Sequence, residues 1–197
     1  MVKPTFSLIL GSASPRRREL LSALGYDFTL LVKDTDESFD PIMPVADVPA
    51  FLAEKKAKAV LPFIDVQSAV LCADTVVILD QQILGKPNSP EEAAEMLDRL
   101  SGKQHKVVTG ICLQSHYGKF VQSDETIVHF KEIPTKAINY YIEHYKPCDK
   151  AGSYGIQEWI GHHFVERIEG SFSTVMGLPT HCIAPLIEQM EQKKRES

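Results

Sequence analysis

The sequence predicts an α/β protein in which helices flank a mixed β-sheet, and three observations support this fold class. Strand-like and helix-like segments alternate along the chain without internal repeats. Of the 197 residues, 44% are hydrophobic and 24% are charged, which is ordinary for a folded globular protein and excludes disorder, collagen-like repeats and a long coiled coil. No linker rich in proline and glycine divides the chain, so we expect a single domain over residues 1–197.

The first half of the chain alternates short strands with two helices. An apolar segment at 6–10 predicts a buried strand, which Gly11 ends. Ser14 and Pro15 predict a helix start, with serine at the N-cap and proline at the first helical position. The other elements expected here are strands at 28–32, 70–79 and 83–84, a tight turn at 80–82, and a helix from about 47 to 60.

The second half begins with a capping box. Ser89, Pro90 and Glu92 predict a helix that closes near Gly102. The other elements expected here are strands at 107–114, 120–130 and 163–168, a turn at 116–119, an amphipathic helix after Pro134 with Ile138, Tyr141, Ile142 and Tyr145 on its apolar face, and a closing helix at 183–190.

Composition excludes several classes of function. The formal net charge of −5 argues against non-specific nucleic-acid binding, which needs a basic surface. No apolar run approaches the ~18 residues of a membrane span, and the N-terminus lacks the features of a signal peptide. The four cysteines form no CxxC pair, and none of the seven histidines lies in an HExxH motif or a paired Cys/His spacing. We therefore expect a cytoplasmic protein with reduced thiols, no membrane partner and no zinc site.

The junction between the first strand and the first helix is the first candidate site. It carries Ser12 and Ser14, followed by Arg16 and Arg17. A helix N-terminus favours anions, and arginines add bidentate contacts to phosphoryl oxygens. By itself, the pattern is equally compatible with an ordinary capped helix that exposes its arginines.

Carboxylates provide the second and third candidates. Asp74 lies inside an otherwise apolar strand, where an unpaired charge would cost several kcal/mol, so it should bind a metal, accept hydrogen bonds or act as a base. A structural aspartate at a strand end is the alternative. Glu37 belongs to an acidic stretch at 34–40, whose oxygen atoms suit Mg²⁺, although a solvated loop would have the same composition.

Two further segments could contact a small anionic ligand. Residues 150–157 combine small residues with Gln157, whose amide can both donate and accept at the edge of a base. The basic run at 55–58 includes Lys56 and is compatible either with phosphate binding or with a solvated helix face.

Together these segments resemble the Maf family of nucleoside triphosphate pyrophosphatases. The resemblance runs from Leu8 to about Ile187. The segments that carry it, in order, are Ser12–Arg17, Asp36-Glu37-Ser38, Lys56-Ala57, Ala73–Val77, Leu84–Pro87, Leu100-Ser101-Gly102, Glu125–Phe130, Asp149–Gln157 and Gly177-Leu178-Pro179.

The resemblance implies a fold, a reaction and a cofactor. It implies an elongated, bent mixed sheet with two lobes and a nucleotide cleft between them, similar to inosine triphosphate pyrophosphatases. It implies hydrolysis between the α and β phosphates, which gives a monophosphate and pyrophosphate. It also implies a divalent cation as cofactor, with Mg²⁺ expected and Mn²⁺ or Co²⁺ as alternatives, and a homodimer as the assembly.

Specific positions place the sequence in one branch of that family. Lys86 and Gln157 are typical of the branch that acts on dTTP and UTP, with Arg16 and Thr75 as further specificity positions. Gln157 would match the O4 and N3–H edge shared by thymine and uracil, which is inverted in cytosine. The other main branch prefers 7-methyl-GTP and differs at these positions.

A mechanism follows from the residues and the resemblance together. Asp74 would be the general base for a water that attacks the α-phosphorus, and would hold the cation with Glu37. The phosphate ligands would be Ser12, Ser14, Arg16, Arg17, Lys56 and Lys86. The register of the phosphate lysine is open between Lys55 and Lys56, and Lys56 is preferred.

Two alternatives remain open at this level. One is a pyrophosphatase for 7-methyl-GTP or with broad specificity, which the pair of Lys86 and Gln157 disfavours. The other is a nucleotide-binding regulator of septum formation and cell division. The presence of Asp74, Glu37 and Lys86 argues against a role in binding alone.

Overall fold

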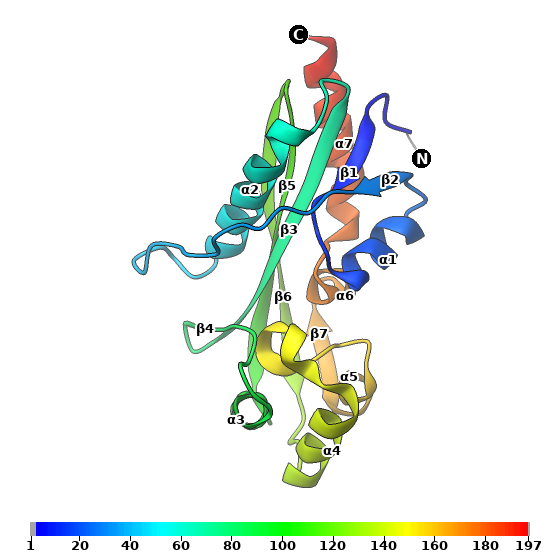
Figure 1. Cartoon of the computed structure of the whole chain (residues 1–197). Coiled ribbons are helices and arrows are strands. Elements are labelled where there is room, and N and C mark those ends of the chain that lie inside the picture. The colour runs from blue at the N-terminus through cyan, green and yellow to red at the C-terminus, as the bar shows by residue number, and fades with distance from the viewer. Residues whose placement is uncertain (1–2, 197) are drawn as a thin grey trace. The chain divides into compact units, whose positions relative to one another are not determined.

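The structure, a computed structural model, describes residues 3–196 and confirms the α/β class (Figure 1). Among the described residues, no helix is both long enough and apolar enough to cross a membrane. The strands are β1 Ser7–Leu10, β2 Phe28–Leu30, β3 Ser68–Leu79, β4 Gln82–Leu84, β5 Gln104–Ser115, β6 Gly118–Phe130 and β7 Val165–Glu169. The α-helices are α1 Pro15–Ala23, α2 Val48–Val60, α3 Pro90–Leu100, α4 Thr135–Tyr145, α5 Trp159–Phe164, α6 Phe172–Met176 and α7 Thr180–Arg195, with 3₁₀ turns η1 Leu61–Phe63, η2 Pro147–Asp149 and η3 Ala151–Ser153.

All seven strands belong to one mixed sheet. Its order is β2-β1-β3-β5-β6-β7, and β4 pairs with β3 outside this path. β1 is parallel to both β2 and β3. β4 is antiparallel to β3, and β7 is antiparallel to β6. The turn at Asp80 and Gln81 has positive φ at both residues, which matches a two-residue hairpin turn.

The chain divides into two compact units. Unit 1 comprises residues 1–74, 109–124 and 177–197, and unit 2 comprises residues 75–108 and 125–176. The long strands β3, β5 and β6 pass from one unit into the other along the chain. The expectation of a single domain over 1–197 stays a prediction.

In unit 1, the alternation of side chains along β3 separates two apolar layers. Ala69, Leu71 and Ala73 contribute to a core shared with α1 and α7. Val70 and Cys72 point to the other face and pack against α2. Because the period of a strand is two, Asp74 continues the row that faces α2.

A glycine in β5 allows α2 to pack directly on the sheet. A Cβ atom at Gly110 would lie 2.2 Å from the backbone nitrogen of Ala50, in the first turn of α2. Any side chain here would therefore push the helix away from the strand. At Gly11, a Cβ would lie 2.3 Å from Cys72 Sγ, so this glycine makes room for Cys72.

Three local expectations were wrong in detail. Ser89 caps α3 by accepting from the Glu92 N–H, but the Glu92 carboxylate accepts from the Asn88 N–H, so the capping box is only half formed. The strand expected at 163–168 begins at Val165, because α5 continues through Phe164. The closing helix begins at Thr180, and Pro185 lies inside it.

A buried histidine gives unit 2 a predictable response to acid. His105 is 3% exposed, and its Nε2 lies 2.7 Å from Tyr154 Oη. Burial, assisted by the nearby His129, lowers the pKa of His105 to about 3. The folded protein therefore binds fewer protons here than the unfolded chain, whose histidine pKa is about 6.5.

We expect the stability that depends on neutral His105 to be present above about pH 6.5 and to be lost as the pH falls, by up to about 1.4 kcal/mol per pH unit. Replacing His105 with glutamine, which keeps a polar partner for Tyr154, should flatten this dependence. Urea unfolding at about pH 7 and about pH 5 measures it in both proteins. If the unfolding free energy changed equally with pH in the wild type and the variant, this would contradict a neutral buried His105.

Candidate active site

Asp74 lies on the α2 side of β3 and is 9% exposed. Helix α2, which covers this side of the sheet, provides a cation that can pair with the Asp74 carboxylate. On α2, Lys56 lies between the buried Leu52 and Val60, at a spacing of four residues from each, and therefore on the face that covers the sheet. The pattern that buries α2 thus also directs Lys56 toward Asp74.

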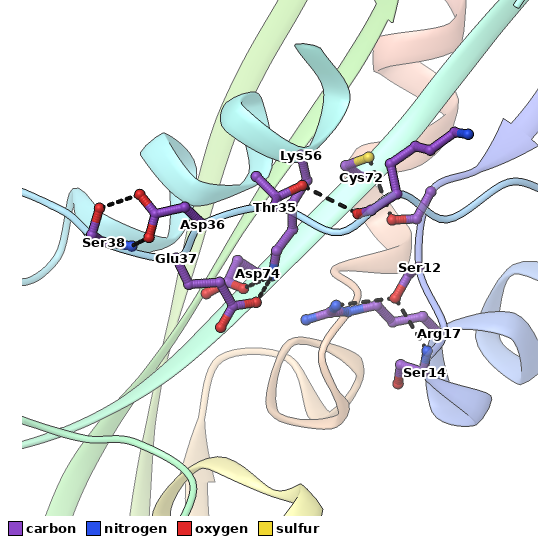
Figure 2. A network of polar contacts seen from close by, with 12 residues as sticks. Ser12, Ser14, Arg17, Thr35, Asp36, Glu37, Ser38, Lys56, Cys72 and Asp74 are labelled. Atoms are coloured by element: carbon purple, nitrogen blue, oxygen red, sulfur yellow. Dashed lines mark hydrogen bonds and ion pairs between the residues drawn. The ribbon is translucent and has the colours of Figure 1, made fainter. Parts of the chain in front are cut away.

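One ammonium group joins two carboxylates. Lys56 Nζ lies 2.5 Å from Asp74 Oδ1 and 2.7 Å from Glu37 Oε1 (Figure 2). Burial opposes the charged form of Lys56, but the carboxylates of Asp74 and Glu37 outweigh it, and the pKa of Lys56 is raised. Glu37 is the more exposed partner, so the arrangement has one sheltered carboxylate and one open to solvent.

Arg17 extends the site from the first turn of α1. Its Nε donates to the carbonyl oxygen of Gly177 at 2.8 Å. Its Nη1 donates to Ser12 Oγ at 3.2 Å (Figure 2). Burial lowers the pKa of Arg17, and the carboxylate of Asp74 acts in the opposite direction. Arg17 is therefore a cation fixed by two contacts within the electrostatic reach of Asp74.

The serines lie at the start of the same helix. Ser14 is the N-cap of α1, as predicted, but its side chain makes no capping hydrogen bond. Ser12 Oγ accepts from the Ser14 N–H at 3.3 Å. Arg16 follows Pro15 in the first turn and influences Arg17 electrostatically.

The structure separates the two neighbouring lysines. Lys55 Nζ lies 2.9 Å from Asp36 Oδ2 and donates to the carbonyl oxygen of Ser38 at 3.1 Å. It therefore fastens the acidic loop to α2, whereas Lys56 faces Asp74. Asp36 in turn accepts from Ser38, and these bonds, with that from Lys55, lower the pKa of Asp36.

In unit 2, two predicted segments lie together. The Gly152 N–H donates to the Gly85 carbonyl at 3.0 Å, which joins the segment containing Lys86 to residues 150–157. Gly152 has φ of +66°, and a Cβ there would lie 2.8 Å from Val77, so the close approach requires glycine. The Lys86 side chain is exposed.

Gln157 and Thr75 are the remaining predicted residues in unit 2. Both are half-buried. Among the described residues, the Oε1 atom of Gln157 is one of the buried side-chain atoms without a hydrogen-bond partner. A buried acceptor without a donor is unfavourable, and a ligand N–H group would satisfy it. Thr75 follows Asp74 in β3, so its side chain points to the opposite face of the strand.

A buried network that sequence reasoning missed supports the segment before Gln157. Tyr141, fully buried on α4, accepts from the Gly155 N–H at 3.0 Å and donates to the Glu158 carboxylate. Lys150 Nζ lies 3.2 Å from Glu158 Oε1. The available signal was Tyr141 on an apolar helix face, because a buried tyrosine hydroxyl normally has a polar partner.

The family model of Maf-like proteins matches residues 7–190. The chain belongs to this family. The matched range includes most of both units and all the site residues described in this subsection.

Curated relatives match almost the whole chain. A dTTP/UTP pyrophosphatase of Porphyromonas gingivalis is 46% identical over 181 residues, which cover 90% of this chain and 91% of that protein. A dTTP/UTP pyrophosphatase of Bacteroides fragilis is 42% identical over 186 residues and covers 94% of this chain and 96% of that protein.

Solved structures resemble the fold only distantly. A nucleoside-triphosphatase, named dITP/XTP pyrophosphatase, from Mycobacterium abscessus has a TM-score of 0.47 at 15% identity and covers 95% of this chain and 97% of that chain. The Ham1 protein of Staphylococcus aureus has a TM-score of 0.47 at 12% identity and covers 63% of this chain and 71% of that chain.

The carboxylates of this Maf-like protein fit a hard divalent cation. The carboxylates of Asp74 and Glu37 lie close enough together for both to contact the Lys56 ammonium. Their oxygen atoms are the kind of ligand that Mg²⁺ prefers. Mg²⁺ usually takes one or two carboxylates and completes its shell with water and substrate phosphates. Two protein carboxylates are therefore sufficient for such a site.

Proposed function

We propose that this Maf-like protein hydrolyses dTTP and UTP to the monophosphate and pyrophosphate. The observation that carries the proposal is the sheltered Asp74 carboxylate, held with Glu37 by one ammonium and accompanied by the fixed Arg17 cation. This arrangement places a base, Asp74, close to two cations, Lys56 and Arg17, that can bind phosphate. The names of the relatives support this reaction and the choice of substrate.

The proposed chemistry is the displacement of pyrophosphate by water. The water oxygen bonds to the α-phosphorus, its proton passes to Asp74, and the bond from the α-phosphorus to the bridging oxygen breaks. The electron pair of that bond leaves with pyrophosphate. Arg17 and Lys56 offset the negative charge that develops on the phosphoryl oxygens, and Ser12, Ser14 and Arg16 bind phosphate beside them.

We assign the divalent cation to Asp74 and Glu37. When bound, such a cation polarises the phosphoryl group and lowers the pKa of a coordinated water. Lys56 contacts both carboxylates, so it orients them and offsets one of their two negative charges before substrate arrives. The oxygen donors favour Mg²⁺, and Mn²⁺ and Co²⁺ are the alternatives to compare.

We assign base recognition to Gln157, with Thr75, Arg16 and Lys86 as further specificity residues. The buried Oε1 of Gln157 can accept from N3–H of thymine or uracil, and its NH₂ group can donate to O4. Cytosine presents an acceptor at N3 and a donor at C4, so the same amide orientation rejects it. The homodimer and the cytoplasmic location stay predictions.

Replacing Gln157 with alanine should lower the ratio of kcat/KM for UTP over CTP by about tenfold or more, since the discriminating hydrogen bonds are lost. The unfolding free energy should change little, because Oε1 makes no hydrogen bond in the described structure. Kinetics with both nucleotides, together with urea unfolding, measure the two effects. An equal loss on UTP and CTP would make Gln157 a structural residue.

A panel of nucleotides tests the proposed function. Pyrophosphate release with Mg²⁺ is measured for dTTP, UTP, CTP, GTP, ATP and 7-methyl-GTP. The proposal expects turnover of dTTP and UTP far above the others. Preference for 7-methyl-GTP would overturn the substrate assignment but not the role of Asp74, and silence on all six with nucleotide still bound would favour a regulator.

A further inference from the structure

A second group of metal-ligand side chains lies in unit 1, outside the proposed active site. Gln122 and Asp124 are two residues apart on β6, so their side chains point to the same face of the strand. His181 and Cys182 lie in the first turn of α7. Among the described residues, Asp124, His181 and Cys182 are the one group of at least three metal-ligand side chains whose donor atoms all lie within 4.8 Å of one another.

The spacing of these atoms suits a tetrahedral metal ion. Asp124 Oδ1 lies 3.4 Å from His181 Nε2. Bonds of about 2.0 Å from Zn²⁺ to oxygen and nitrogen give a tetrahedral ligand–ligand distance of about 3.3 Å, so this pair already has the required separation. Cys182 Sγ lies within 4.8 Å of both atoms and would provide the third ligand.

The surroundings distinguish this cysteine from an inert core residue. Cys182 is 3% exposed and packs in the unit 1 core, and the Gln122 Nε2 donates to its Sγ at 3.3 Å. A donor to sulfur favours the thiolate, and such contacts around ligands are typical of metal sites. His181 is 54% exposed, so the group opens to solvent on one side.

We propose, contrary to the sequence-based expectation of no zinc site, that Asp124, His181 and Cys182 form a site for Zn²⁺ or a similar borderline transition metal ion, with the fourth position open to solvent. A mixed set of oxygen, nitrogen and sulfur donors suits Zn²⁺ and disfavours Mg²⁺. Binding exchanges the thiol proton of Cys182 for the metal, and the proton passes to solvent. Burial, assisted by Asp124, raises the pKa of Cys182, so the metal-free protein carries the thiol.

This site is distinct from the proposed catalytic cation and shares no residue with it. It would fasten the start of α7 to β6. Three residues before Thr180 is Gly177, whose carbonyl holds Arg17. The metal would therefore stabilise the segment that fixes Arg17, and its main effect would be on stability.

Cobalt provides the test, because a thiolate bound to Co²⁺ gives a charge-transfer absorption band that carboxylates do not give. The full chain is treated with chelator, kept reduced, and titrated with Co²⁺ in excess Mg²⁺, which occupies oxygen-only sites. We expect about one equivalent to bind with this band, and Zn²⁺ to displace it. His181→Ala, at an exposed position, should weaken binding by roughly tenfold or more.

Matched controls separate this site from other ligands. His116→Ala removes another exposed histidine of unit 1, and Cys148→Ser removes the exposed cysteine. Both should retain the band, and Cys182→Ser should lose it. The proposal is wrong if the wild type gives no thiolate band, or if His181→Ala binds Co²⁺ with the same affinity and the same band as the wild type. A third outcome is that Co²⁺ binds without the thiolate band and that this binding is lost in Glu37→Gln. The ion would then lie at the active-site carboxylates, which would overturn this proposal and leave the proposed function intact.

Discussion

Replacing Asp74 with asparagine is expected to lower pyrophosphate release from dTTP by about 10³-fold, because the variant keeps the shape of the side chain but cannot take the proton of the attacking water. Binding of a non-hydrolysable dTTP analogue should remain measurable, since Arg17 and the start of α1 are unchanged. Single-turnover kinetics and equilibrium binding measure the two effects.

The control for this variant is Asp27→Asn, which removes a fully exposed carboxylate of unit 1. Its turnover should stay within about twofold of the wild type. Because Asp74 pairs with the half-buried Lys56, urea unfolding must show that the Asp74 variant is folded under assay conditions. Near-normal turnover in Asp74→Asn would remove Asp74 as the base.

Replacing Arg17 with lysine is expected to lower kcat/KM for dTTP by about 10²-fold, although the charge is kept. Arg17 contacts Gly177 with one nitrogen and Ser12 with another, and a single ammonium cannot reproduce both contacts and bind phosphate. Steady-state kinetics show the loss. Exposed Arg18 is the matched control, and Arg18→Lys should behave as the wild type. Equal activity of the two variants would show that Arg17 acts only through its charge.

Local patterns in the sequence singled out Asp74 and Lys56, but they did not predict the ion pair between the two side chains. The apolar run around Asp74 required a partner for a sheltered carboxylate. The row formed by Leu52, Lys56 and Val60 explains why Lys56, and not Lys55, faces that carboxylate. The directions of these side chains follow from the periods of a strand and a helix, which are properties of the local chain, whereas the sequence preference for Lys56 came from the resemblance to the Maf family.

Contacts between distant segments could not be predicted in this way. Tyr141 and Glu158 meet because α4 packs beside the segment at 150–157, and Asp124 meets His181 because α7 lies on β6. Helix α5 extends through residues with strand character because the His162 N–H reaches the Glu158 carbonyl and His163 contacts Trp159. These outcomes depend on tertiary packing, which the order of residues alone does not specify.

Hydrolysis of dTTP in ¹⁸O-labelled water tests the central claim most directly. If Asp74 activates a water that attacks the α-phosphorus, the label must appear in dTMP and the pyrophosphate must remain unlabelled. Mass spectrometry of both products gives the answer in a single experiment. Label in the pyrophosphate would mean attack at the β-phosphorus and would contradict the proposed roles of Asp74, Lys56 and Arg17.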